Sequence, residues 1–359
     1  MGGALTRRDP EDHRPDVLSA PRPRGDAANW VTRGAGSSQH LASVLQEGRE
    51  NANVDAGLGF TGESQVMRTT SDDPKLIYDV GMHNGDDTAY YLWRGFRVVA
   101  IEPNPELVAT AANRFRREIE AGYLKILNVG IAAEEGELPF WVCQTDSRLS
   151  SFDRRNASLD SFYAVHEIRV PCRKFRSILD DFGVPFYLKV DIQGNDFLCI
   201  EALDPGELPK FLSVEFALSD MPLVALMHER GFNQFKCISQ THFLPLELPP
   251  VAEARLIQRA ERLSQTRNTL IRVFRKLGGG YWIQRQFNRL RTRSGWVFPA
   301  GSSGPFGDEL LGRWLSYEEL CMTAREFLRL RQEAPQTLLW ASEGLGSNPF
   351  WADLHARSD

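Results

Sequence analysis

Short apolar runs alternate with amphipathic segments through the middle of this chain, and this alternation limits the fold more than any other sequence feature. Leu76–Val80 and Arg97–Ile101 are strand-length apolar runs, and residues 87–94 between them have a helical pattern. A second helical segment covers 104–122, and a third apolar run covers 124–129. Parallel strands have such continuous apolar runs because helices cover both faces of their sheet. The sequence therefore predicts an α/β fold with a mostly parallel, doubly wound sheet.

The same alternation continues for about another hundred residues, and it bounds the predicted α/β domain at 74–248. The further predicted strands are 137–143, 167–172, 185–190, 211–216 and 233–238, and the further predicted helices are 174–182, 195–203 and 222–230. We expect 233–238 to be the last strand.

The two ends of the chain differ from this domain. Residues 1–73 are rich in Arg, Asp, Pro, Gly, Ser and Asn. Such a composition buries little apolar surface and predicts a disordered or loosely ordered leader, with one short helix over 37–51. Residues 249–359 are predicted as a mainly helical C-terminal extension with a helix over 317–331. We expect the tail 351–355 to pack or face solvent rather than bind metal.

The extension begins with an arginine-rich segment, 253–293. Three interpretations stay open for it: a solvated helical face, a helix lying on a membrane surface, or contact with an anionic substrate. The whole chain has a formal net charge of -5, so bulk charge predicts no nucleic-acid partner.

Cysteine usage and hydropathy indicate the compartment. The chain has five cysteines, an odd number with no Cys-x-x-Cys pair, which argues against a disulfide framework and a zinc site. We expect no bound metal. The sequence contains neither an apolar run of about 18 residues nor an apolar signal-peptide core. These features predict a cytoplasmic protein.

A glycine-containing loop, 79–88, lies where the first strand turns into a helix, and it reads Asp-Val-Gly-Met-His-Asn-Gly-Asp-Asp-Thr. Glycine allows a sharp turn and close backbone approach to a ligand at the helix N-terminus. The Gly-x-x-x-Gly spacing differs from the dinucleotide fingerprint, and the acidic residues after it suit a cationic sulfonium better than a pyrophosphate. A tight turn without a ligand is the alternative. The ligand-binding residues predicted here are Asp79, Gly81, Asn84, Gly85, Asp86 and Thr88.

Glu102 ends the second predicted strand, 21 residues after Gly81. An acid at this place can accept hydrogen bonds from both ribose hydroxyls of an adenosine ligand. Asn104 could support the ribose edge, and Asn128 and Gly130 follow the third strand where an adenine would lie. These residues complete a predicted adenosine site.

Four blocks of the chain together resemble the FkbM family of methyltransferases. The matching stretches are Asp79-Val80-Gly81 with Gly85 and Thr88, Ala100-Ile101-Glu102-Pro103, Leu188-Lys189-Val190-Asp191-Ile192-Gln193-Gly194 and Ser213-Val214-Glu215-Phe216. The resemblance covers about residues 75–240. It implies a Rossmann-like methyltransferase fold, S-adenosylmethionine as methyl donor, and O-methylation of a hydroxyl on a glycan or natural product. The chain departs from the family at Gln193 and Asp196, where the family usually has Glu.

Methyl transfer to a hydroxyl gains from a general base, and Asp191 is our first candidate, with Lys189 as its charge partner on the same strand face. A purely structural Lys189–Asp191 ion pair is the alternative. His83 and His242 are alternate bases. Asp191 with Glu215 supplies too few oxygens to predict a metal.

Two other functions are alternatives to a methyltransferase acting on a small-molecule or glycan acceptor. A non-catalytic member that keeps the fold as a binding or assembly module is favoured by Gln193 and Asp196. A dinucleotide-dependent oxidoreductase is disfavoured by the glycine spacing.

Overall fold

The computed structural model describes residues 75–159, 161–217, 220–240, 243–248, 292, 295–299, 301–333 and 351–358. All of them belong to the unit Val66–Asp359. The predicted leader 1–73, its helix 37–51, His242 and all of the segment 253–293 except Thr292 lie outside the described residues.

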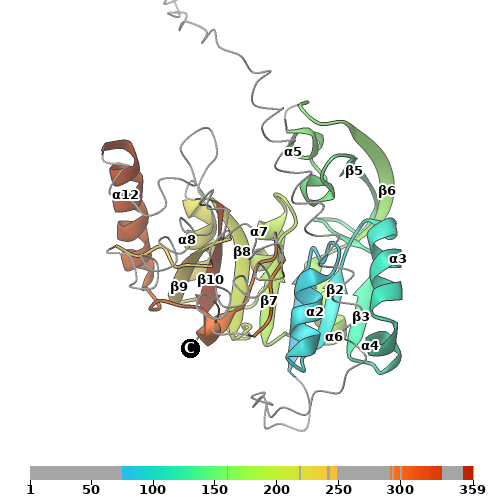
Figure 1. Cartoon of the computed structure of the whole chain (residues 1–359), viewed down its shortest axis with the longest axis horizontal. Helices are drawn as coiled ribbons and strands as arrows, with labels where there is room; N and C mark the ends of the chain where they lie inside the picture. Colours follow the sequence, from blue (N-terminus) through green and yellow to red (C-terminus); the bar gives the residue numbers. More distant parts are fainter. Residues whose placement is uncertain are drawn as a thin grey trace, which may run out of the picture. The chain divides into compact units, whose positions relative to one another are not determined.

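A seven-stranded sheet lies at the centre of the described residues. Its strands are β1 (Leu76–Val80), β2 (Arg97–Ile101), β3 (Leu124–Leu127), β7 (Tyr187–Val190), β8 (Phe211–Ala217), β9 (Gln234–Ser239) and β10 (Trp351–Arg357). They lie in the order β3-β2-β1-β7-β8-β10-β9 (Figure 1). β1, β2, β3, β7 and β8 pair in parallel, and β10 runs antiparallel to both of its neighbours. The predicted mostly parallel, Rossmann-like methyltransferase fold is confirmed.

Helices cover both faces of this sheet. Alternate side chains of each strand point to opposite faces, and the apolar side chains on both faces are buried against helices. In β1, Tyr78 and Val80 belong to one hydrophobic core and Ile77 to the other. The first core also holds residues of α6, α7, α8 and α12, and the second holds residues of α2 and α3. The helices are α2 (Asp86–Trp93), α3 (Pro105–Arg114), α4 (Arg116–Glu120), α6 (Phe175–Phe182), α7 (Asp196–Glu201), α8 (Met221–Arg230) and α12 (Tyr317–Glu333).

The helix expected over 104–122 is two helices, α3 and α4, which are separated at Phe115. Asn104 caps α3, since its side chain accepts a hydrogen bond from the backbone N–H of Glu106 at 3.0 Å. The Phe115 ring lies against Gly85 at the start of α2. The Phe115 ring at this break therefore packs against the predicted ligand-binding loop at Gly85.

A second, three-stranded sheet has the order β4-β6-β5, and its strands are β4 (Gly130–Ile131), β5 (Gly136–Cys143) and β6 (Val165–Arg173). The strands predicted at 137–143 and 167–172 are confirmed. The short helices η2 (Ser147–Leu149) and α5 (Arg154–Ser158) connect β5 to β6, where no helix was predicted. We call residues 130–173 the cap. Its own small core contains Phe140, Val142 and Val170.

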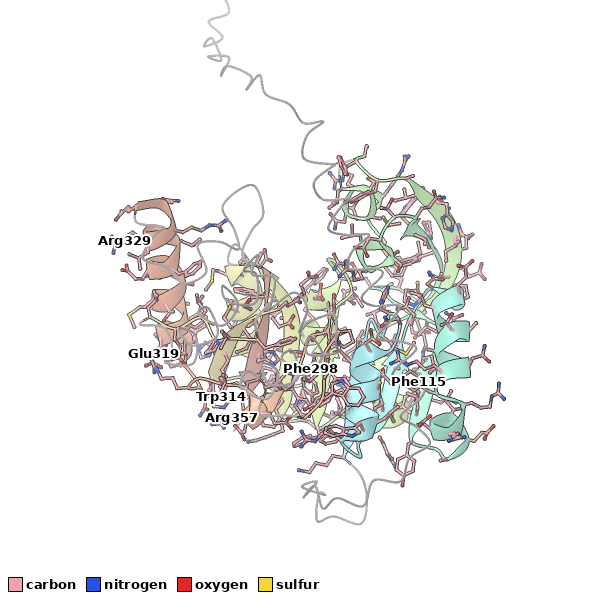
Figure 2. The ribbon with its side chains drawn as sticks, in the orientation of Figure 1. Phe115, Phe298, Trp314, Glu319, Arg329 and Arg357 are labelled. Carbon is pink, nitrogen blue, oxygen red and sulfur yellow. The ribbon has the colours of Figure 1, made fainter. Side chains whose placement is uncertain are left out.

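The C-terminal strand β10 lies between β8 and β9 (Figure 1). The expectation that 233–238 would be the last strand is therefore wrong. The strand is also held at its end, where the Arg357 guanidinium lies over the Trp314 ring at 5.0 Å (Figure 2). Lys210 Nζ donates to the Ser358 carbonyl at 2.8 Å. The extension thus contributes an internal strand of the sheet, next to the edge strand β9.

All five cysteine side chains are unpaired thiols. No helix among the described residues has the length and apolarity needed to cross a membrane. In the same part of the chain, no group of three or more His, Cys, Asp and Glu side chains is placed to hold a metal ion.

Candidate active site

The turn after β1 requires glycine at position 81. Gly81 has φ +80°, and its N–H and that of Met82 both donate to the Ile101 carbonyl at 3.0 Å. A Cβ built on Gly81 would lie 1.9 Å from the carbonyl oxygen of Asp191. Strands β1 and β7 therefore approach so closely at their carboxyl ends that a side chain on residue 81 has no room.

Gly85 has a different role from the one expected. It caps the N-terminus of α2 with φ +79°, and a Cβ there would lie 2.6 Å from the Phe115 ring. It does not line the cavity described below. Its missing side chain makes room for protein packing rather than for a ligand.

Asp79 is buried in a charged network below the turn. Its Oδ2 accepts a 2.6 Å hydrogen bond from Thr88 Oγ1, and its Oδ1 lies 3.2 Å from Lys189 Nζ. Lys189 Nζ also donates to the Gly81 carbonyl at 2.9 Å and lies 3.8 Å from Asp191 Oδ2. Burial opposes charge on Lys189, but the carboxylates of Asp79, Asp191 and Asp87 outweigh burial and raise the pKa of Lys189. The network therefore fixes the turn.

Glu102 follows β2 and is 5% exposed. Its two carboxylate oxygens accept from the backbone N–H groups of His83 and Asn104, each at 2.9 Å. Burial raises the pKa of Glu102 to about 7, and these two hydrogen bonds oppose the rise. Asn128 donates to the carbonyls of Glu102 and Pro103, both at 2.9 Å. Asn104 and Asn128 therefore support the position of Glu102 from outside the cavity.

Asn84 and Asp86 form the outer part of the loop, and both line the cavity. Asn84 Nδ2 donates to Asp86 Oδ2 at 2.8 Å, and Asp86 N–H donates back to Asn84 Oδ1 at 3.1 Å. Arg114 Nη1 pairs with Asp86 Oδ1 at 2.8 Å. Arg114 of α3 thus partly neutralises the charge of Asp86 in the protein without a ligand.

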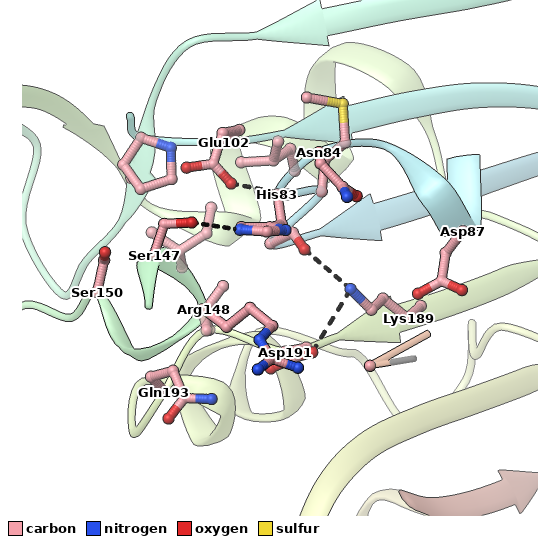
Figure 3. Close-up of a pocket in the computed structure, with 18 of the residues that line it drawn as sticks. His83, Asn84, Asp87, Glu102, Ser147, Arg148, Ser150, Lys189, Asp191 and Gln193 are labelled. Atoms are coloured by element: carbon pink, nitrogen blue, oxygen red, sulfur yellow. Dashed lines mark hydrogen bonds and ion pairs between the residues drawn. The ribbon is translucent and has the colours of Figure 1, made fainter. Parts of the chain in front are cut away.

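A cavity of about 250 Å³ lies at the carboxyl ends of β1, β2 and β7 (Figure 3). This volume is slightly below the roughly 300–1,000 Å³ of common small-molecule sites. The cavity brings together predicted site residues from three separate strands: Gly81, Glu102, Lys189 and Asp191. It also includes residues outside the predicted site, which come from the cap, from the residue after β9 and from the C-terminal extension: Phe140, Ser147, Arg148, Ser150, Phe152, Gln240, Gly301 and Ser302.

Gly130, which was predicted to lie near an adenine, is at the cap side of the cavity. A Cβ on Gly130 would lie 2.3 Å from the Phe152 ring. Phe152 in turn packs on Phe140, with ring centroids 5.0 Å apart. This side of the cavity is therefore apolar and aromatic, whereas the strand-end side is charged.

His83 lies inside the cavity with φ 53°, a backbone region that is uncommon for a side-chain-bearing residue. Its Nε2 is hydrogen-bonded to Ser147 Oγ of the cap at 2.7 Å (Figure 3). Burial lowers the pKa of His83, and the charges of Lys189 and Arg148 lower it further. The ring is therefore neutral at physiological pH and directed toward a hydroxyl.

The C-terminal extension is attached to this site by two buried hydrogen-bonded contacts. Asp87 accepts from Ser302 Oγ and, at 3.1 Å, from the Ser303 backbone N–H. Gln240 Nε2 donates to Asp353 Oδ1 of β10 at 2.7 Å. Burial raises the pKa of Asp87 to about 6 and that of Asp353 well above its usual range. Segments far apart in the sequence thus close one wall of the cavity.

Comparison with known families connects this geometry to a domain type. Residues 79–232 match the model described as the methyltransferase FkbM domain. Over this stretch, which is less than half of the chain, the sequence is similar to the methyltransferase FkbM domain. No curated protein matches the sequence.

Solved structures with similar folds are distant from this chain. The [4+2]-cyclase SpnF is 12% identical, covers 81% of this chain and 78% of its own, and has a TM-score of 0.31. The precorrin-6y C5,15-methyltransferase from Geobacter metallireducens GS-15 is 13% identical, with 48% and 72% coverage and a TM-score of 0.28. A TehB-like SAM-dependent methyltransferase from Corynebacterium glutamicum is 11% identical, with 56% and 88% coverage and a TM-score of 0.28. At such low similarity, the strand order carries the fold assignment.

The two departures from the usual FkbM sequence take part in local hydrogen bonds. Gln193 Nε2 donates to Glu215 Oε2 at 2.7 Å. Asp196 accepts from the backbone N–H groups of Ile192 and Gly194, at 3.2 and 3.1 Å, at the start of α7. Both residues therefore hold the loop after Asp191 in place.

Gln193→Glu is expected to destabilise the protein at neutral pH by about 1–2 kcal/mol, because a second carboxylate would face Glu215 in place of an amide donor. Two facing carboxylates raise one pKa, so the missing stability should return as pH falls toward about 4. Urea denaturation at both pH values measures this. Gln193→Met, which removes the hydrogen bond without adding charge, should show no such pH dependence. Equal stability of Gln193→Glu and wild type at neutral pH would contradict the hydrogen bond from Gln193 to Glu215.

Proposed function

We propose that this protein is an S-adenosylmethionine-dependent methyltransferase that methylates a hydroxyl of a glycan or a natural product. The main support is the cavity itself, which joins the Gly81 turn and Glu102 to two proton acceptors, His83 and Asp191. The FkbM domain match supports the same chemistry.

The residues around the cavity fit this donor. Glu102 presents a buried carboxylate suited to ribose hydroxyls, since each carboxylate oxygen can accept a further hydrogen bond beyond the backbone N–H that it holds. Phe140 and Phe152 with Gly130 form an apolar side suited to an adenine. Gly81 lets the carboxyl ends of β1 and β7 come together, and both ends line the cavity. Glu102 would therefore hold the ribose, and the cap would cover the base.

S-adenosylmethionine supplies an electrophilic methyl group, so the protein needs chiefly to orient the two reactants and to accept a proton. His83 is the better placed of the two acceptors. It is neutral, lies in the cavity and is already hydrogen-bonded to a hydroxyl, that of Ser147. Asp191 lies beside Lys189, which stays charged. We therefore propose His83 as the proton acceptor, ahead of Asp191, which the sequence analysis ranked first.

The acceptor class and the location belong to this proposal as well. A small-molecule or glycan hydroxyl is supported by the FkbM resemblance, and a net charge of -5 gives no support for a nucleic-acid substrate. Five unpaired thiols support a reducing, cytoplasmic location.

The experiment uses methyl-labelled S-adenosylmethionine with fractionated extracts of the source organism. Labelled product should appear with wild type, and His83→Asn should lower the turnover at least about 100-fold while S-adenosylhomocysteine affinity changes less than about threefold. Asp191→Asn is the matched comparison. With the donor at saturating concentration, so that weaker donor binding does not lower the rate, Asp191→Asn shows the turnover loss if Asp191 accepts the proton, and His83→Asn does not.

The non-catalytic alternative makes a separate prediction in the same experiment. A binding or assembly module would bind S-adenosylhomocysteine without labelling any fraction. Failure of wild type to bind S-adenosylhomocysteine in calorimetry would reject the donor, and with it the proposed function.

A further inference from the structure

Arg148 lies on η2 of the cap and lines the cavity beside Asp191 (Figure 3). Its Nη1 lies 2.7 Å from the position that a Cβ on Gly301 would occupy, and Gly301 has φ +86°. Glycine at this position thus gives the guanidinium room inside the cavity.

Asp146 holds the guanidinium in a fixed orientation. Arg148 Nε donates to Asp146 Oδ1 at 2.9 Å, and Nη2 donates to Oδ2 at 2.6 Å. The hydrogen bonds to Asp146 raise the pKa of Arg148, burial opposes the rise, and the charges of Asp146 and Asp191 add to it. Nη1 has no hydrogen-bond partner among the described residues. A planar guanidinium held from one side presents its remaining N–H donors in a set geometry, which suits a carboxylate.

The other basic side chains on the cavity wall are not available in this way. Lys189 is 4% exposed in its side chain and is occupied by the Gly81 carbonyl and Asp79. His83 is neutral and therefore offers no positive charge to a carboxylate. Among the described residues that line the cavity, Arg148 is therefore the cation with donors free for a ligand.

We propose that Arg148 binds the carboxylate of the amino-acid moiety of the methyl donor. The donor's amino acid is a zwitterion, and a site that recognises it needs a cation and an anion in the same cavity. Asp191 lines the same cavity and supplies the anion for the ammonium group. This inference rests on the proposed function, and it assigns a donor contact to a cap residue outside the strand-end motifs.

The test compares two donors that differ only in this carboxylate, S-adenosylmethionine and decarboxylated S-adenosylmethionine, by calorimetry at neutral pH. Wild type should bind the complete donor about 10- to 100-fold more tightly, the range for a charge-assisted hydrogen bond. Arg148→Gln should lose that difference by weakening the complete donor alone. Asp146→Asn, which loosens the guanidinium, should lose part of it.

Arg155→Gln is the matched control. Arg155 is also an arginine of the cap paired to an aspartate two residues earlier, Asp153, but it does not line the cavity. The Arg155→Gln variant should bind both donors with the affinities of wild type.

Three results would overturn the inference. Equal affinity of wild type for the two donors would show that no group recognises the carboxylate. An equal loss for both donors in Arg148→Gln would assign Arg148 to the structure of the cap. No loss for either would leave Arg148 free for an acidic acceptor. Failure of wild type to bind either donor would instead reject the proposed function.

Discussion

Gly81→Ala is expected to abolish measurable S-adenosylhomocysteine binding and to lower the free energy of unfolding by more than about 3 kcal/mol. The Cβ would lie 1.9 Å from the Asp191 carbonyl oxygen, so β1 and β7 would have to separate at the cavity floor. The positive φ adds a strain of about 1–2 kcal/mol for a non-glycine residue. Urea denaturation and calorimetry measure the two effects.

Gly122→Ala separates the strain from the clash. Gly122 has φ +76°, close to that of Gly81, but a Cβ there meets no atom within 4 Å. This variant should lose only the roughly 1–2 kcal/mol of backbone strain and should bind S-adenosylhomocysteine normally. Similar losses in the two variants would mean that the close approach at Gly81 is unimportant.

Glu102→Ala is expected to weaken S-adenosylhomocysteine binding about 100-fold or more, because two ribose hydroxyls would lose charge-assisted acceptors. The variant also leaves the N–H groups of His83 and Asn104 without their carboxylate partners, so the loop should loosen. Calorimetry measures the affinity. Binding within a few-fold of wild type would place the ribose elsewhere.

The pH dependence tests the same contact in wild type. The pKa of Glu102 is raised to about 7, so the carboxylate is protonated progressively below that pH. Affinity for S-adenosylhomocysteine should therefore fall as pH drops from about 8 to about 5.5, and Glu102→Ala should remove this part of the dependence.

Stability of the free protein should change in the opposite direction. A raised pKa favours the folded state at low pH, and this contribution is lost as pH rises through about 7.

Residues at strand ends could be predicted because their position follows from the fold. Parallel strands share one carboxyl edge, so the runs ending before Gly81, Glu102 and Asp191 had to bring these residues together. The role of Gly85 could not be predicted in this way. The Phe115 ring contacts Gly85 at the point where α3 ends. Phe115 is 30 residues from Gly85 in the sequence, so the residues around Gly85 do not indicate this contact.

Strand β10 was not predicted because its polar residues, Asp353 and His355, indicate an exposed tail. Asp353 and His355 alternate with Ala352, Leu354 and Ala356, as in a strand with one solvated face, yet both polar residues are at most 2% exposed. Burial and the charge of Lys236 lower the pKa of His355 to about 3, so its ring is neutral. Arg148 was missed for a related reason, since its place in the cavity depends on the cap and on Gly301 together.

The position of β10 also has a consequence for synthesis of the chain. β9 ends at Ser239 and β10 begins at Trp351, so the ribosome completes both neighbours long before the strand that joins them. At about 5–20 residues per second, the facing edges of β8 and β9 stay unpaired for on the order of ten seconds. Open strand edges recruit other strands. A nascent or truncated chain that ends before residue 351 should therefore depend on chaperones and aggregate readily, even though it contains all of residues 79–232, the stretch similar to the FkbM domain.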